Sequence, residues 1–184
     1  MHQQTITNLI EQCKHNNTGA YRELVEAHQT MVYSLAFRMI GSSDEAQDIT
    51  QETFIKAWTH LQRFDTNMKF STWLYKIATN LCYDKIRWHK RRYNVTSINI
   101  NDYAVLNHPS DENIECELIN NDLAQLISAL TNNLSPKQKL VFTLRDIGGL
   151  EVAEIEVITG LTAEKIKSNL YLARQFIKSK IEKK

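Results

Sequence analysis

The sequence has few cysteines and few residues that break helices. Its 184 residues include 3 cysteines, 5 glycines and 2 prolines. Cys13, Cys82 and Cys116 are odd in number and far apart, and no CxxC pair or close Cys/His pair occurs, so we expect reduced thiols, no disulfide framework and no metal site. No apolar run approaches the ~20 residues of a membrane span, and the first residues lack a signal-peptide pattern. We therefore predict a cytoplasmic protein without membrane insertion.

Patterns typical of catalysis are missing as well. The sequence contains no recognisable nucleophile–base pair, metal-ligand cluster or glycine-rich phosphate loop. We therefore expect no enzyme activity and no cofactor. The hydrophobic content of 42% and the charged content of 23% are ordinary for a folded chain.

The net charge of +1 conceals three regions of different sign. Residues 1–94 contain 12 Lys/Arg and 9 Asp/Glu, residues 95–133 contain none and 6, and residues 134–184 contain 10 and 6. Two positive regions suit a polyanionic partner, and the acidic stretch between them is expected to avoid that partner.

Apolar residues recur every three or four positions over long segments, which is the helical period. Residues 95–112 lose this period and gain Asn, Asp and Ser, which indicates a linker. The sequence predicts an all-α fold with two small domains, 1–94 and 113–184, joined by an acidic linker at 95–112. The expected helices cover 5–14, 18–39, 43–60, 71 or 72 to 92, 113–134, 136–146, 151–159 and 162–182, with Ser43 as the expected cap of the third.

Residues 151–177 have the layout of a DNA-binding helix-turn-helix. A short helix with inward apolar residues is followed by Gly160, which can adopt a left-handed turn, and by Thr162, which can cap a longer helix. The expected inward stripe of this longer helix consists of Ile166, Leu170, Ala173, Ile177 and Ile181. A recognition helix presents polar side chains near its N-terminus to base edges in the major groove. The candidate side chains are Glu164, Lys165, Lys167, Ser168, Tyr171 and Arg174. A plain helical hairpin that only buries its apolar stripe fits the same period.

Two helices of the first domain have faces of opposite charge. On the helix near 71–92, one face interleaves cations with aromatic and amide groups, which suits binding to phosphates and unpaired bases. The alternative is that Trp73, Tyr83 and Trp88 are core residues and that residues 90–92 form a solvated helix end. On the helix near 43–60, an acidic face would repel DNA and indicates a protein partner, although a solvated face is the alternative. The basic face carries Lys76, Asn80, Tyr83, Arg87, Lys90 and Arg91, and the acidic face carries Asp44, Asp48, Gln51, Glu52 and Ile55.

Two segments resemble a known family. DEAQDITQETFIKAW followed by RFDTNMKFSTWLYKIATNLCYDKIRWHKRR resembles the second conserved region of sigma-70-type factors, and is most similar to the extracytoplasmic-function (ECF) group, which keeps two domains. LSPKQKLVFTLRDIGGLEVAEIEVITGLTAEKIKSNLYLAR resembles their fourth region. The resemblance implies that the acidic face docks on the clamp helices of the largest subunit of core RNA polymerase. It also implies that the basic face and the preceding loop capture the −10 element, and that the recognition helix reads the −35 element. The loop contributes Arg63, Phe64, Asp65 and Lys69.

The chain departs from the family pattern at three positions. Glu156 stands where a small residue is usual between the two helices of the motif, and Asn169 and Leu172 stand where Arg is common. Loss of two cations is expected to weaken −35 binding and its salt dependence. The function that we predict is an alternative sigma factor that binds core RNA polymerase and promoter DNA, with an anti-sigma factor as a further candidate partner. The alternatives are a helix-turn-helix regulator that acts without polymerase and a helical protein–protein adaptor with reduced DNA binding.

Overall fold

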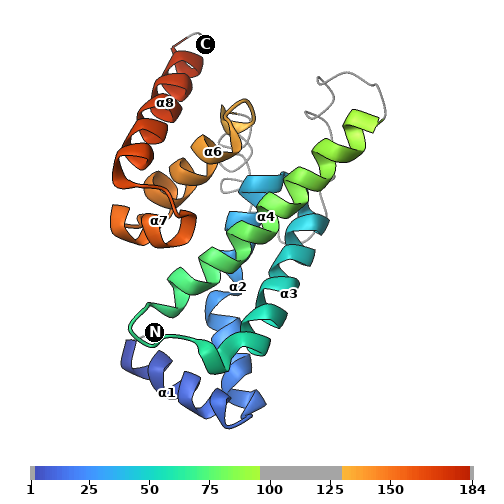
Figure 1. The fold of residues 1–184 in the computed structure, drawn as a ribbon, viewed down its shortest axis with the longest axis vertical. Coiled ribbons are helices and arrows are strands. Elements are labelled where there is room, and N and C mark those ends of the chain that lie inside the picture. The colour runs from blue at the N-terminus through green and yellow to red at the C-terminus, as the bar shows by residue number, and fades with distance from the viewer. Residues whose placement is uncertain (1–2, 96–129, 183–184) are drawn as a thin grey trace, which may run out of the picture. The chain divides into compact units, whose positions relative to one another are not determined.

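The computed structural model describes residues 3–95 and 130–182 (Figure 1). All of the regular structure in these residues is helical, which confirms the all-α prediction. The predicted linker and most of the predicted helix 113–134 lie outside the described residues. The chain forms two compact units, one made mainly of residues up to Trp88 and the other mainly of residues from His89 onward. None of the described helices combines the length and the apolar character that a membrane crossing requires.

Four α-helices make up most of the first unit: α1 (Gln3–Lys14), α2 (Thr18–Ile40), α3 (Ser43–His60) and α4 (Phe70–Val95), with a 3-10 turn, η1 (Leu61–Arg63), after α3. In Figure 1, α2, α3 and α4 run alongside one another and α1 lies across one end of them. The boundaries follow local chemistry. The side chain of Asn17 accepts the Ala20 N–H at 3.1 Å at the start of α2, and Gly41 ends that helix in the left-handed conformation, with φ of 83°.

Two predicted helix starts differ from the structure by one or two residues. The cap of α3 is Ser42 rather than Ser43, because the Ser42 hydroxyl accepts the Glu45 N–H at 3.4 Å. The Ser43 hydroxyl instead lies 3.0 Å from that of Tyr33. Helix α4 begins at Phe70 rather than at position 71 or 72.

The core of the first unit includes a cluster of rings beneath the loop between η1 and α4. Phe70 is 1% exposed and meets Phe64 edge-on, with 5.6 Å between the ring centroids. His28 on α2 meets Phe70 from another side, with 5.3 Å between centroids, and Trp73 lies 4.9 Å from Phe64. Aromatic pairs in such geometry stabilise a core beyond the area they bury. The cluster therefore fixes the start of α4 against α2 and the loop.

The second unit contains two short helices, α6 (Pro136–Phe142) and α7 (Val152–Thr159), a π-helical turn η3 (Thr143–Ile147) and the longer helix α8 (Ala163–Ile181). Ser135 and Gln138 form a reciprocal capping box with Pro136 at the first turn of α6, as the Ser-Pro pair predicts. The last residues of the predicted helix 136–146 form the π-helical turn η3 instead of α-helix. In this turn the Gly148 N–H donates to the Thr143 carbonyl at 2.8 Å. A Cβ at Gly148 would lie 2.9 Å from the Leu144 carbonyl oxygen, so this closure requires glycine.

The helix-turn-helix geometry follows the prediction closely. Gly160 has φ of 69°, and Thr162 caps α8 by accepting the Lys165 N–H at 3.4 Å. The predicted inward stripe of α8 is buried over its first half, at Ile166, Leu170 and Ala173. Ile181 was expected on the same stripe, but it is 59% exposed. It is the last residue of the helix, where little of the unit remains to cover it.

Candidate nucleic-acid and protein interfaces

The acidic face of α3 points outward along the helix. Asp44, Asp48, Gln51 and Glu52 are exposed, and Ile55 is 60% exposed. The opposite face of the helix supplies the core of the unit, and this burial fixes which side of the helix reaches solvent. The Glu52 carboxylate lies 3.5 Å from the Lys56 ammonium group, one turn further along. The structure therefore brings all five predicted residues together on one accessible surface.

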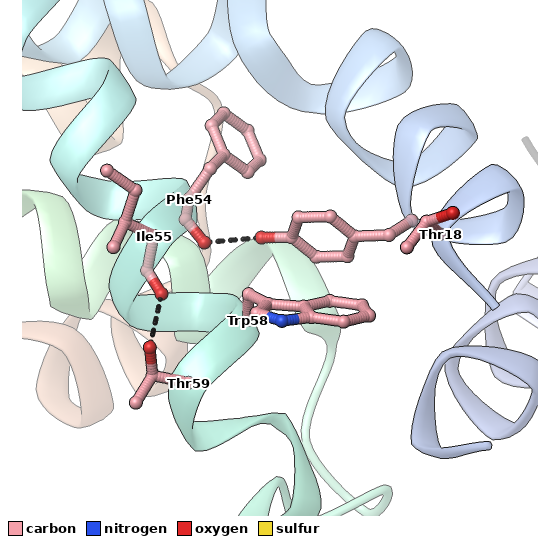
Figure 2. A pocket seen from close by; sticks show the side chains of 6 residues that line it. Thr18, Phe54, Ile55, Trp58 and Thr59 are labelled. Atoms are coloured by element: carbon pink, nitrogen blue, oxygen red, sulfur yellow. Dashed lines mark hydrogen bonds between the residues drawn. The ribbon is translucent and has the colours of Figure 1, made fainter. Parts of the chain in front are cut away.

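An apolar hollow of about 330 Å³ borders this acidic face and shares Ile55 with it (Figure 2). The Tyr21 hydroxyl donates to the Phe54 carbonyl, and the rings of Tyr21 and Trp58 lie 4.7 Å apart. Burial raises the pKa of the Tyr21 hydroxyl, so it remains a neutral donor. The helical period of the sequence did not predict this hollow. Its lining residues are Thr18, Tyr21, Phe54, Ile55, Trp58 and Thr59.

The basic face of α4 is likewise exposed along the helix, at Lys76, Asn80, Arg87, Lys90 and Arg91. Tyr83 is half-buried, and burial raises the pKa of its hydroxyl to about 12. Only part of its ring is therefore accessible to a base. Arg87 pairs with Asp84 on the same helix. The Lys85 ammonium group lies 3.1 Å from the Glu45 carboxylate, which ties α4 to the first turn of α3.

Two tryptophans of α4 differ in their surroundings. Trp73 packs between Phe64 and Phe70, as the core interpretation predicts. Trp88 is 44% exposed, so the core interpretation is wrong for this residue. The Lys85 ammonium group lies 5.4 Å from the centre of the Trp88 ring, within cation–π range. The Trp88 ring therefore adds an accessible aromatic surface beside the cations of α4.

The loop before α4 is shaped by its own hydrogen bonds. The Asp65 carboxylate accepts the Asn67 N–H and the Asn67 side-chain amide, both at 2.9 Å. Arg63, Asp65 and Lys69 are exposed on this loop. Phe64 is 6% exposed and lies in the ring cluster, so the expectation of a DNA contact from its side chain is corrected to a supporting position beneath the loop.

The candidate base-reading residues of α8 lie on the face opposite its buried stripe. Glu164, Lys165, Lys167, Ser168 and Tyr171 are exposed. Arg174 is exposed too, but it is already engaged. Its guanidinium group donates to both carboxylate oxygens of Asp146, at 2.8 and 2.6 Å, and this pairing raises its pKa. The pair joins the π turn to α8, 28 positions apart in sequence.

Each residue that departs from the family pattern has a definite place in the structure. The Glu156 carboxylate accepts the Ala163 N–H at 2.7 Å, so it reaches from α7 to the first turn of α8. A negative group at a helix N-terminus is favoured by the helix dipole. The Asn169 side-chain amide donates to the Lys165 carbonyl at 2.7 Å, and Leu172 is 48% exposed.

Groups suited to metal binding or nucleophilic chemistry do not gather at these surfaces. In the part of the chain that the structure describes, no group of three His, Cys, Asp or Glu side chains is placed to hold a metal ion. Cys13 and Cys82 are buried, and burial raises their pKa values to about 11 and about 12. Both thiols are therefore poor nucleophiles at neutral pH.

Comparison with known proteins yields the same family for both units. The sigma-70 region 2 profile matches residues 24–92, and the sigma-70 region 4 profile matches residues 124–177. The chain is 31% identical over 181 residues to the ECF RNA polymerase sigma factor SigW of Bacillus subtilis, an alignment that covers 94% of each chain. It is 29% identical over 178 residues to the ECF RNA polymerase sigma-E factor of Haemophilus influenzae, covering 95% of this chain and 94% of the relative.

Solved structures share the fold. CnrH, in complex with the cytosolic domain of CnrY, superposes with a TM-score of 0.70 at 21% identity and covers 97% of each chain. RpoE of Bartonella quintana, in complex with the anti-sigma factor NepR, superposes with a TM-score of 0.71 at 23% identity, covering 88% of this chain and 96% of that one. The two family profiles and the similarity to SigW show that the chain belongs to the sigma-70 family, in the group of ECF RNA polymerase sigma factors.

Proposed function

We propose that the chain is an alternative sigma factor that binds core RNA polymerase, brings it to −10 and −35 promoter elements and promotes DNA opening. The observation that carries this function is the pair of exposed faces on α3 and α4, one acidic and one basic, within a single helical unit. One face suits a protein and the other suits a nucleic acid. Family membership supports the same activity. Sigma factors are not enzymes.

The acidic face of α3 is the proposed docking surface for the clamp helices of the largest polymerase subunit. Its exposed carboxylates at Asp48 and Glu52 can pair with basic groups, and Ile55 with the adjoining hollow can accept an apolar side chain. An apolar centre with a charged rim is the usual anatomy of a protein interface. Charge complementarity at such a rim mainly sets encounter rate and register.

The basic face of α4 and the loop before it are the proposed −10 surface. Lys76, Arg87 and Lys90 can neutralise phosphates, and Asn80 can bond to a base edge. The Phe64 ring supports the loop from the core, so the contacts from the loop fall to Arg63, Asp65 and Lys69. Exposed Trp88 offers a ring for stacking that Tyr83 offers only in part.

The outward face of α8 is the proposed −35 surface, on a second domain that begins near residue 113. We place the first domain at residues 1–94, with an acidic linker at 95–112. The family acts with RNA polymerase, which supports a cytoplasmic location. An anti-sigma factor is a further proposed partner, in keeping with the RpoE structure, which was solved with one.

The test of this function is co-elution of the full chain with core RNA polymerase in gel filtration. We expect a stable complex that binds promoter DNA, and we expect Asp48→Lys with Glu52→Lys to weaken it at least tenfold, more at low salt. The matched control is Glu23→Lys with Glu26→Lys, which reverses two exposed carboxylates on α2. A chain that binds promoter duplex without polymerase would be a regulator, and a chain that binds neither polymerase nor DNA would be an adaptor.

A further inference from the structure

The recognition helix α8 exposes two large apolar side chains side by side. Tyr171 is 62% exposed and Leu172 is 48% exposed. At 3.6 residues per turn, both flank the line of Ser168 and Gln175, opposite the buried stripe. A single exposed apolar side chain is normal on a protein surface, whereas two at consecutive positions on the outward face of the proposed binding helix form a candidate contact surface.

Polar side chains near this pair are turned toward the protein itself. Asn169 bonds to the Lys165 carbonyl, and Arg174 is held by Asp146. The Tyr171 hydroxyl accepts a hydrogen bond from the Gln175 amide at 3.0 Å, which orients the Tyr171 ring. The exposed surfaces of Tyr171 and Leu172 therefore lie on the two sides of the polar line formed by Ser168 and Gln175.

The charges around the pair favour DNA over a protein as the occupant. Lys165 and Lys167 are exposed one to two turns before Leu172, and residues 134–184 carry 10 Lys/Arg against 6 Asp/Glu. A polyanion such as DNA is complementary to this excess of positive charge. In the major groove of DNA, the apolar group presented by a base is the 5-methyl group of thymine.

The helix is also held in a fixed orientation, which base reading requires. Glu156 fixes its first turn through the Ala163 N–H, and Thr162 caps it. The bidentate pair between Arg174 and Asp146 restrains it further along its length. Rotation of α8 about its own axis would break the contacts with Glu156 and Asp146, so Leu172 is presented in one direction.

We propose that Leu172, with Tyr171 beside it, contacts the 5-methyl group of a thymine in the −35 element and is a specificity-determining residue of this protein. The proposal rests on the proposed role of α8 in −35 binding. The arginine that is common at position 172 in the family would contact a phosphate or a base. Leu172 instead makes an apolar contact with one type of base. The promoter is therefore expected to carry thymine at a defined −35 position, on either strand.

The experiment uses the full chain bound to core polymerase and a promoter obtained by selection from a randomised −35 element. Each thymine of that element is replaced in turn by deoxyuridine, which removes the methyl group and keeps base pairing. At one or two positions we expect affinity to fall about three- to fourfold, the factor for one buried methyl group. Leu172→Ala should abolish this uracil effect, whereas Lys167→Ala should retain it. Ile181→Ala, an exposed apolar residue at the end of the same helix, is the control and should change nothing.

The outcomes separate this proposal from the proposed function. Equal affinity for thymine and uracil at every position, or a selected −35 element without thymine, overturns the role of Leu172 while sigma activity stands. A Leu172→Ala variant that keeps the uracil effect also overturns it, and weaker polymerase binding of the same variant would assign Leu172 to a protein contact. Failure of the wild-type complex to bind any promoter would instead refute the proposed function itself.

Discussion

The two units of the protein are held together by different means. In the first unit, long helices enclose a ring cluster around Phe70, and its proposed binding faces consist of side chains that the core does not need. In the second unit α6 and α7 are short, and polar contacts from Glu156, Arg174 and Ser135 fix where each helix begins or how it is oriented. Most of the charged side chains on the proposed faces of the first unit are exposed to solvent, whereas Arg174 on the proposed face of the second unit also maintains the structure.

The two units also differ in the charge of their buried basic side chains. His28 in the first unit is 7% exposed, with its Nδ1 atom 2.9 Å from the Leu24 carbonyl oxygen; burial lowers its pKa, so it is neutral at pH 7. Lys139 in the second unit is 8% exposed, and its ammonium group donates to the Asn132 side-chain carbonyl at 3.3 Å. Burial lowers the pKa of Lys139 to about 8, so it still carries a charge at pH 7. A buried charge with one neutral partner destabilises the folded state.

The largest expected effect concerns the ring cluster of the first unit. Phe70→Ala removes a ring that contacts Phe64, His28 and Trp73, and we expect a loss of ~3–5 kcal/mol in the free energy of unfolding. Removing the cap of the second unit with Ser135→Ala should cost only ~0.5–2 kcal/mol. Urea unfolding of both variants, followed by circular dichroism, measures the two losses. Equal losses in the free energy of unfolding would mean that the Phe70 ring stabilises the first unit no more than the Ser135 cap stabilises the second.

The next effect comes from Lys139. Lys139→Met keeps the length of the side chain and removes the charge, and we expect it to stabilise the protein by about 1–3 kcal/mol at pH 7. The folded-state pKa of about 8 lies below the ordinary 10.5, so the unfolded state binds more protons between these values. The stability of the wild type should therefore rise with pH over this window, relative to the variant. A constant difference between wild type and variant from pH 7 to 10.5 contradicts this expectation.

The basic end of α4 should affect DNA binding without affecting stability. Replacing Lys90, Arg91 and Arg92 by Ala should flatten the plot of log affinity for promoter DNA against log salt, by up to ~0.9 for each phosphate of duplex DNA that the variant no longer neutralises. Titrations of the polymerase complex over a series of salt concentrations give the slope. Identical slopes for wild type and variant would show that the run is only a solvated helix end.

The smallest expected effect lies at the pair of Asp146 and Arg174. Asp146→Asn should cost ~1 kcal/mol or less in stability, because Arg174 is largely exposed. The same change releases the guanidinium group, so duplex DNA should bind more tightly at low salt and with a steeper salt slope. Arg174→Gln, which lacks the cation, should lose similar stability without the gain in DNA binding. A similar gain when Asp146→Asn is introduced into the Arg174→Gln variant would assign the effect to the lost acidic charge instead.

Much of the local structure could be predicted because its signals are local. Caps at Ser135 and Thr162 and the glycine turns at Gly41 and Gly160 act over a few residues, so they mark helix ends in the sequence itself. The helical period likewise predicted that the acidic face of α3 would be exposed, because burial of one side of a helix leaves the other in solvent. The one-residue error at Ser43 arose because two consecutive serines offer equivalent caps.

Features that depend on distant residues could not be read in the same way. Phe64 lies in a charged loop by sequence, yet its ring packs against Phe70 and Trp73, in a cluster to which His28 of α2 also contributes. The hollow beside Ile55 exists because Tyr21 reaches across from α2 to the Phe54 carbonyl, 33 positions away.

The helical fold, the sign of charge on each face and the family all follow from the order of the amino acids. Packing of the helices determines which of the charged and apolar side chains remain available to a partner. Arg174 is a candidate DNA contact by sequence, but Asp146 engages it. Glu156 departs from the family pattern, in which a small residue is usual, but its carboxylate accepts an N–H at the start of α8. Helical periodicity assigns a side chain to a face, whereas pairing depends on which atoms approach within about 3 Å after folding, and that distance is set by helices far apart in sequence.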